Sequence, residues 1–117
     1  MKPAIDDFLP LAPATLHILL SLAGEKMYGY AIMQEVARQS DGRYKLGPGT
    51  LYDNLQRLMK QGLVEEVGSR AEEDSSRRRY YRLSGTGSRV LTAEIDRLRD
   101  VVELAQAHLK LPHARRT

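Results

Sequence analysis

The chain has 117 residues, with 18 Lys and Arg against 15 Asp and Glu, a formal net charge of +3, and no cysteine. This length allows one domain with a real core but is small for a two-domain enzyme, and the lack of cysteine excludes disulfides, thiolate metal sites and a cysteine nucleophile. So small a positive charge indicates an anionic partner only where it is concentrated in one part of the molecule. Residues 1–10 do not resemble a signal peptide and no apolar run approaches the roughly 20 residues of a membrane span, so we expect a soluble, cytoplasmic domain that does not enter a membrane.

The N-terminal part of the chain predicts an irregular segment followed by a helix. Residues 1–12 carry two prolines among apolar side chains that are candidates to pack on a partner chain. Pro13 stands where proline is favoured, at the first position of a helix, and leucines at helical spacing continue from it to about residue 23. His17 lies among these leucines. Because no second ligand lies one turn away, we interpret it as a packing residue rather than a metal ligand.

Two further helices are predicted over residues 29–39 and 47–60. In the second of them Leu51, Leu55 and Leu58 recur at steps of four and three, so they share one face. The other faces carry donor groups, which are Thr50, Tyr52, Asn54, Gln56, Arg57 and Lys60. A short helix with an apolar anchor and a donor-rich outer surface is suited to contact a polyanion.

A hairpin follows the third helix. Residues 63–67 and 79–83 favour strands, and the polar, charged stretch 68–77 between them is typical of a loop. Residues 25–29 are expected to be a short connection, and residues 43–46 are compatible with either a brief strand or a loop.

One long helix is predicted over residues 88–109, with Ser84 or Thr86 able to cap it. Its apolar residues follow the 4, 3, 4 spacing of a coiled-coil seam over about three heptads. A helix of about 22 residues spans roughly 33 Å, which is more than a small domain needs, so a second copy of the chain is the simplest cover. The predicted dimer contacts are Leu91, Ile95, Leu98, Val101, Val102, Ala105 and Leu109.

The order of these elements predicts a mainly α-helical fold with a small β-hairpin, of the winged helix-turn-helix type. Residues 1–12 form an N-terminal segment, 13–83 the winged-helix domain, 84–111 a C-terminal dimerisation helix and 112–117 a basic tail. In such folds the third helix enters the major groove of DNA. The hairpin of residues 63–83 is the wing, and its loop lies near an adjacent phosphate track.

The residues also resemble a known family. The segments 13–20 (PATLHILL), 28–32 (YGYAI), 46–52 (LGPGTLY), 62–64 (GLV) and 78–83 (RRYYRL), in this order and spacing, are similar to the PadR family of bacterial transcriptional regulators. The resemblance implies a homodimeric repressor with crossed C-terminal helices. Such a dimer reads a near-palindromic operator with half-sites about one helical turn, roughly 34 Å, apart.

Several positions take a role in DNA binding from this resemblance. It places Tyr30 on the DNA backbone, Thr50 and Tyr52 at the part of the third helix nearest to DNA, and Lys60 at that helix's end. It also assigns the basic pair of the wing, Arg78 and Arg79. The sequence departs from the family pattern at Tyr28, where histidine is common, and in the wing loop, which carries Glu72, Glu73 and Asp74.

The residues themselves suggest further DNA contacts. Gly47, Pro48 and Gly49 leave free backbone N–H groups at a helix start, which suit a phosphate, although a tight turn that needs glycine is an alternative. Asn54 is able to read adenine, and Arg57 to bind guanine or a phosphate. Two stripes compete to face the bases, one of them Thr50, Asn54, Arg57 and Gln61, and the other Tyr52, Gln56 and Lys60.

Other function classes are weaker. The three histidines have no paired carboxylate or hydroxyl at a telling spacing, and there is no glycine-rich phosphate cradle or metal motif, so we expect neither an enzyme nor a bound cofactor. The alternative is a winged-helix module for protein association or small-molecule sensing with weak DNA binding. The sequence leaves a small-molecule effector at an apolar dimer interface open.

Overall fold

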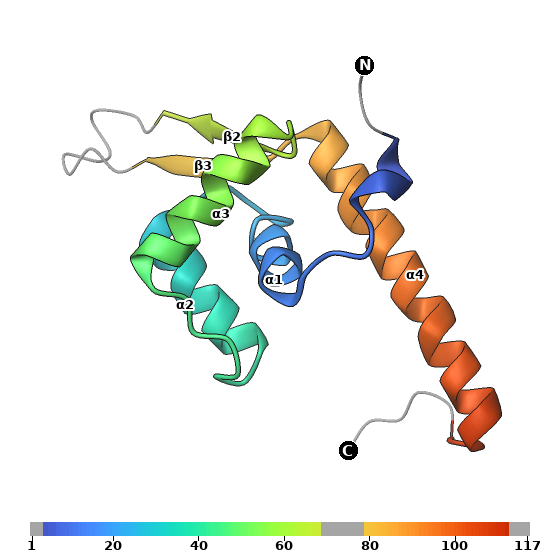
Figure 1. The fold of residues 1–117 in the computed structure, drawn as a ribbon. Coiled ribbons are helices and arrows are strands. Elements are labelled where there is room, and N and C mark those ends of the chain that lie inside the picture. The colour runs from blue at the N-terminus through green and yellow to red at the C-terminus, as the bar shows by residue number, and fades with distance from the viewer. Residues whose placement is uncertain (1–3, 69–78, 113–117) are drawn as a thin grey trace.

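A computed structural model of the chain describes residues 4–68 and 79–112. In chain order the elements are η1 (Ile5–Phe8), α1 (Pro13–Ser21), β1 (Met27–Tyr28), α2 (Gly29–Gln39), α3 (Pro48–Lys60), β2 (Val64–Val67), β3 (Tyr80–Leu83) and α4 (Gly85–Leu109). The helices α1 to α3 and a small sheet form one body, and the long C-terminal helix α4 extends from it (Figure 1). The predicted fold class, mainly helical with a wing, is confirmed.

The sheet has three antiparallel strands in the order β1-β3-β2, with Met27 opposite Tyr81 and Val64 opposite Leu83. The expectation that residues 25–29 only connect two helices is therefore wrong. A strand as short as β1 has no alternation to detect, and it exists because it pairs with β3, where the Tyr28 and Tyr80 rings meet edge to face at 5.7 Å. Residues 43–46 remain a loop.

The core lies between the three helices, the sheet and the start of α4. The face of α3 that packs into this core is the one that the leucine spacing predicts, since Leu51, Leu55 and Leu58 are all buried. Burial of each such side chain contributes roughly 1.5–3 kcal/mol, which anchors α3 firmly. The buried apolar residues are Ile18, Leu19, Leu22, Ile32, Val36, Leu51, Leu55, Leu58, Leu63, Val64, Tyr81, Val90 and Leu91.

The end of α3 and the start of α4 are joined by hydrogen bonds. Gly62 adopts a φ of 77°, so that the Leu63 N–H reaches the Leu58 carbonyl and closes α3. Ser84 caps α4 by accepting from the Gly87 N–H at 2.9 Å, and its hydroxyl donates to the Gly62 carbonyl at 2.6 Å. A Cβ on Gly87 would lie 2.0 Å from the Leu63 carbonyl oxygen. This crowding and these bonds fix α4 relative to α3, and the cap starts α4 three residues before the predicted position.

The N-terminal segment packs on its own chain. Ile5 and Phe8 of η1 and the following Leu11 pack against the core, and η1 lies beside α4 (Figure 1). The Glu94 side chain, only 1% exposed, accepts from the Leu11 N–H at 3.0 Å and from Arg97 at 2.6 Å. Arg97 and the Leu11 N–H hold the pKa of the Glu94 carboxyl below its ordinary value. This charged group therefore ties the N-terminal segment to α4.

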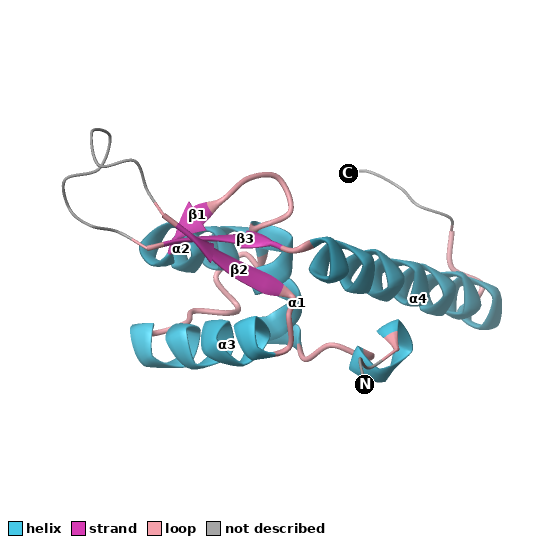
Figure 2. Cartoon of the chain, turned by 90° about the horizontal axis from the view of Figure 1, so that it is seen from above, coloured by secondary structure: helices cyan, strands magenta, loops and turns pink. Residues whose placement is uncertain are grey.

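Among the described residues, the long helix α4 is covered only near its start. Leu91, 7% exposed, fills the core of its own chain, and Ile95 packs against that core. This placement corrects the predicted dimer seam, because a buried side chain is not available to a partner, and Leu91 is no longer assigned there. Farther along, α4 stands away from the body (Figure 2), and its exposed apolar residues are Val101, Val102, Leu104 and Leu109.

Two further observations concern the described residues. None of their helices has the length and apolar character that crossing a membrane requires. His17 is half-buried, its Nδ1 lies 3.0 Å from the Gln39 side-chain oxygen, and its ring centre lies 5.1 Å from that of Tyr44, in agreement with its interpretation as a packing residue.

Candidate nucleic-acid interface

The outward face of α3 follows from the burial of its leucines. Opposite the leucine face lie Gly49, Asp53, Gln56 and Lys60, at steps of four, three and four, and all of them are exposed. Tyr52 and Arg57 stand on the two flanks of this outer stripe. The stripe differs from both stripes that the sequence alone suggests, because neither of those contains Gly49 or Asp53.

Asn54 is turned inward, which corrects the prediction that it reads adenine. It is 9% exposed, and its amide donates to the Thr50 carbonyl of the preceding turn at 2.9 Å. Its oxygen accepts from the Thr15 hydroxyl of α1 at 3.4 Å and from Arg57. With both ends of its amide in use inside the protein, Asn54 joins α3 to α1, and we leave it out of the set that contacts DNA.

Arg57 belongs to the same network. Its guanidinium donates to the Asn54 oxygen and, at 3.2 Å, to the Thr15 hydroxyl. The side chain thus leans from α3 toward α1 and the N-terminal segment, away from the wing. In this position it contributes positive charge at the edge of the outer stripe rather than at its centre.

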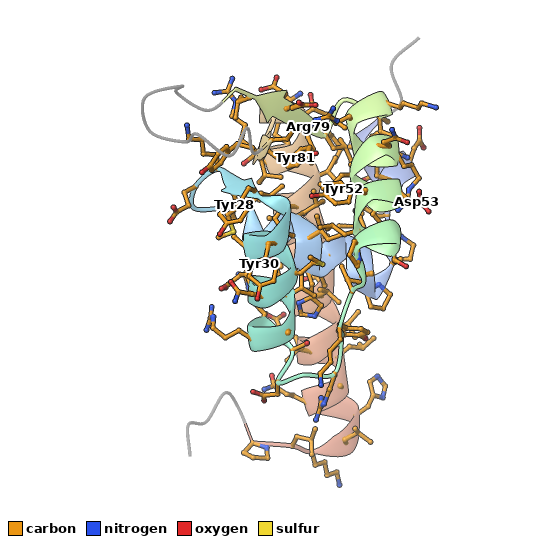
Figure 3. The ribbon with its side chains drawn as sticks, turned by 90° about the vertical axis from the view of Figure 1, so that its left-hand side faces the viewer. Tyr28, Tyr30, Tyr52, Asp53, Arg79 and Tyr81 are labelled. Carbon is orange, nitrogen blue, oxygen red and sulfur yellow. The ribbon has the colours of Figure 1, made fainter. Side chains whose placement is uncertain are left out.

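On the other flank, tyrosines from two helices meet the wing. The hydroxyl of Tyr52 packs over the start of α2, where a Cβ on Gly29 would lie 2.2 Å from it. Tyr30, one residue into α2, is 57% exposed. A surface cavity of about 430 Å³ opens here, lined by Tyr28, Gly29, Tyr30, Tyr52 and Arg79. In Figure 3, Tyr28, Tyr30, Tyr52 and Arg79 are seen from this side of the fold, and Asp53 lies across α3 from Tyr52.

The base of the wing carries paired and buried groups. Arg79 is exposed and lies 3.8 Å from the Glu66 carboxylate, while Arg82 and Glu65 make a closer pair at 2.9 Å. Burial raises the pKa of Tyr81, so this phenol stays protonated and neutral. Arg78, Glu72, Glu73 and Asp74 lie outside the described residues.

The start of α3 is exposed at Gly47, Pro48 and Gly49, with Pro48 in the first turn as predicted for a helix start. Gly47 has an ordinary extended φ of −79°, and Gly49 has no positive φ. A Cβ built on either glycine meets nothing within 4 Å. Neither torsion nor packing therefore requires glycine, which removes the tight-turn explanation. The open backbone instead leaves room for an external group to approach the free N–H groups.

Most of the predicted DNA contacts are exposed, among them Gly49, Tyr52 and Lys60 of α3. Tyr52 lines one cavity with Tyr30 of α2 and Arg79 of the wing. Sequence reasoning overlooked Asp53, although counting back four residues from Arg57 or seven from Lys60 places it on the outer face. Thr50 is exposed at the first turn, on the Arg57 flank.

Comparison with known proteins agrees with this arrangement. The family model for the transcriptional regulator PadR-like family matches residues 18–93. Transcriptional regulator Rv3488 of Mycobacterium tuberculosis is 36% identical over 83 residues, which cover 71% of this chain and 73% of the relative.

Solved structures share the fold. A PadR family transcription regulator from Clostridium difficile superposes with a TM-score of 0.67 at 26% identity, over 84% of this chain and 99% of that chain. Bacillus subtilis PadR, crystallised in complex with operator DNA, gives 0.62 at 17% identity, over 74% and 48% of the two chains, and at that identity the likeness concerns the fold alone. The family model spans more than half of the sequence and the mycobacterial relative covers most of it, so the chain belongs to the PadR-like family, whose members are transcriptional regulators and not enzymes.

Proposed function

We propose that the chain is a sequence-specific DNA-binding regulator that acts as a homodimeric repressor. It binds a near-palindromic operator through α3 and the wing. The observation that carries this proposal is the exposed outer stripe of α3, which lies between the open helix start at Gly49 and the cationic end at Lys60. Bacillus subtilis PadR, which shares this fold, is crystallised in complex with operator DNA, which supports DNA as the partner.

Each group on the surface has a role that its chemistry suits. The N–H groups at the start of α3 and the hydroxyls of Tyr30 and Tyr52 donate to phosphates, which fixes the position of the protein on the duplex. Lys60 and Arg79 add charge to the phosphate contacts. Thr50 lies close enough to the helix start to contact the same strand. Because a regulator of this kind binds chromosomal DNA, we expect the protein to work in the cytoplasm.

The dimer is formed by the uncovered part of α4. Apolar surface is exposed along a part of α4 that the rest of the described chain leaves uncovered. It belongs to the predicted seam residues Leu98, Val102, Ala105 and Leu109 and to the neighbouring Val101 and Leu104. A second copy buries this surface and orients two α3 helices toward successive major grooves. Half-sites then lie about one helical turn, roughly 34 Å, apart.

Selection of bound duplexes from a random pool tests binding, symmetry and half-site spacing together. Wild-type protein is expected to enrich a near-palindrome, with affinity that falls steeply as salt rises because phosphate contacts release counterions. Tyr52→Ala is expected to weaken binding by about 1–3 kcal/mol, and Lys60→Ala to weaken all sequences uniformly and reduce the salt slope by about one per contact. Ser88→Ala, at an exposed site on α4, is the matched control. Unchanged binding in both α3 variants with an intact fold would remove α3 from the interface.

Small-molecule sensing is the second candidate, favoured by two cavities that share Phe8 of the N-terminal segment. One, of about 450 Å³, is also lined by Leu11, Arg57 and Gln61, and the other, of about 350 Å³, by Ile5 and Arg89. A ligand there would touch both the end of α3 and the segment that is tied to α4. If the protein is only an association or sensing module, it sediments as a monomer at micromolar concentration and shifts no duplex at low salt.

A further inference from the structure

An acidic side chain occupies the middle of the surface that we assign to DNA. Asp53 is exposed on the outer stripe of α3, between Gly49 one turn earlier and Gln56 and Lys60 in the turns that follow. Every other polar side chain on this stripe and its flanks is neutral or cationic. Near phosphates a carboxylate lowers affinity, so its position calls for a physical reason.

The part of the chain that the structure describes offers no such reason. Arg57, one turn later and of opposite charge, is the natural ion-pair partner at this spacing, yet it donates to Asn54 and Thr15 instead. Within residues 4–68 and 79–112, nothing forms a hydrogen bond or ion pair with the Asp53 carboxylate. The second turn of a helix is also too far from its N-terminus for the helix dipole to favour an acid, and aspartate is a weak helix former.

The chemistry of the major groove supplies a reason. An ionised carboxylate only accepts hydrogen bonds, and the edges of the bases there offer two donors, the N4 amino group of cytosine and the N6 amino group of adenine. Cytosine presents its amino group beside no acceptor of its own, whereas adenine sets its N7 acceptor next to the donor, which repels a carboxylate. A lone acidic side chain on a recognition helix therefore favours cytosine.

We propose that Asp53 is a specificity-determining residue that accepts a hydrogen bond from cytosine N4 at one fixed position of each half-site. The inference rests on the proposed DNA-binding function and adds the base that this site reads. In this arrangement Tyr30, Tyr52, Lys60 and Arg79 hold the protein on the phosphates. Asp53 lowers the affinity for every duplex but increases the difference in affinity between sites with and without the cytosine. A duplex without the cytosine leaves the Asp53 charge unpaired near the phosphates.

The test compares duplex selection by the full-length wild-type protein with that by Asp53→Asn and Asp53→Ala. Asp100→Asn, which removes the same charge from an exposed position on the side of α4 opposite the dimer seam, is the matched control. Wild type and the control are expected to enrich cytosine at one position per half-site. Asp53→Asn is expected to shift this preference to adenine, because an amide pairs with adenine N6 and N7.

Asp53→Ala is expected to lose the preference at that position, with about tenfold less discrimination between the cytosine site and a single-base variant. Its affinity for random-sequence duplex is expected to rise, because a charge that repels phosphates is gone. Circular dichroism checks that each variant remains folded.

The outcomes separate the inference from the function on which it rests. If wild type enriches a site but both Asp53 variants enrich the same bases at every position, the assignment of Asp53 is wrong while DNA binding stands. If wild type enriches an A·T pair at the position that the Asp53 variants change, the contact to cytosine is also wrong, because only a G·C pair, in either orientation, presents the cytosine amino group. If wild type enriches no duplex at low salt, the proposed function itself fails.

Discussion

The two longest helices use their apolar residues in opposite ways. In α3 every leucine is buried in the core of its own chain, and the outer face is polar from Gly49 to Lys60. In α4 the core takes residues only up to about Ile95, and apolar side chains such as Leu109, 66% exposed, continue into solvent. A helix that buries its apolar face in its own domain exposes a polar face, which suits a polar partner. A helix that keeps apolar residues exposed is built for another protein surface.

The strongest way to test this contrast is to truncate one leucine of α3. Leu55→Ala removes a fully buried side chain and is expected to lower the free energy of unfolding by about 3 kcal/mol, through lost burial and the cavity left behind. Chemical denaturation at several protein concentrations measures it, and the loss should be the same at each. Leu104→Ala, on exposed α4 surface, is the comparison. If Leu55→Ala costs less than the Leu104 variant at low concentration, α3 is not the better anchored helix.

A charge on the uncovered part of α4 is expected to break association instead of folding. Val102→Asp places carboxylates in the surface that the second copy is proposed to cover, where they are desolvated and face each other across the symmetry axis. We expect dimer association at least roughly 100-fold weaker, with helix content retained. Sedimentation equilibrium gives the association constant. The matched control is Glu103→Gln, a neighbour on α4, and a Val102 variant that dimerises like wild type would move the interface elsewhere.

The tie between the N-terminal segment and α4 is expected to depend on pH. Because the pKa of Glu94 is lowered in the folded chain, its contribution to stability is fully present above the ordinary carboxyl pKa and is lost as the pH falls through the lowered value. Glu94→Gln removes the charge that holds Leu11 and Arg97 and is expected to cost about 2 kcal/mol at neutral pH.

Chemical denaturation of wild type and Glu94→Gln at a series of acidic pH values tests whether the stabilisation by Glu94 is lost as the pH falls. The difference between them should shrink as the pH falls below the ordinary carboxyl range. A difference that stays constant with pH would show that the packing of residue 94, and not its charge, holds the segment. Asp96→Asn, which breaks an exposed pair with Arg99, is the control and is expected to change little.

Much of the fold follows from patterns that the sequence states directly. The leucine spacing of α3, Pro13 and Pro48 at helix starts and Ser84 before α4 each specify local structure through a local rule, and all are confirmed. The strand β1 and the packing of the N-terminal segment depend on partners far along the chain, Tyr80 and Glu94, which no local pattern reveals.

The site shows the same division. Helical spacing predicts that Tyr52 and Lys60 lie outside the core, but it does not show that Asn54 turns inward, because that depends on Thr15 of another helix. Likewise the seam spacing of α4 does not tell which of its residues the chain covers itself, and Leu91 is assigned to the core only once the helices are in place. Contacts between helices decide these positions, and those contacts are tertiary.

The smallest expected effect is a difference between the same substitution at the start of α3 and at the start of α4. Gly49 in the first turn of α3 and Gly85 in the first turn of α4 both have open space where a Cβ would stand. Alanine at either position is expected to raise the free energy of unfolding by about 0.5 kcal/mol, since it restricts the unfolded chain. Only Gly49→Ala is expected to weaken DNA binding, by several-fold, because its methyl group stands between the α3 backbone and the phosphate. Equal duplex affinity for the two variants would mean that no phosphate approaches the start of α3 so closely, and the phosphate contacts would then belong to the tyrosine hydroxyls and the cationic side chains.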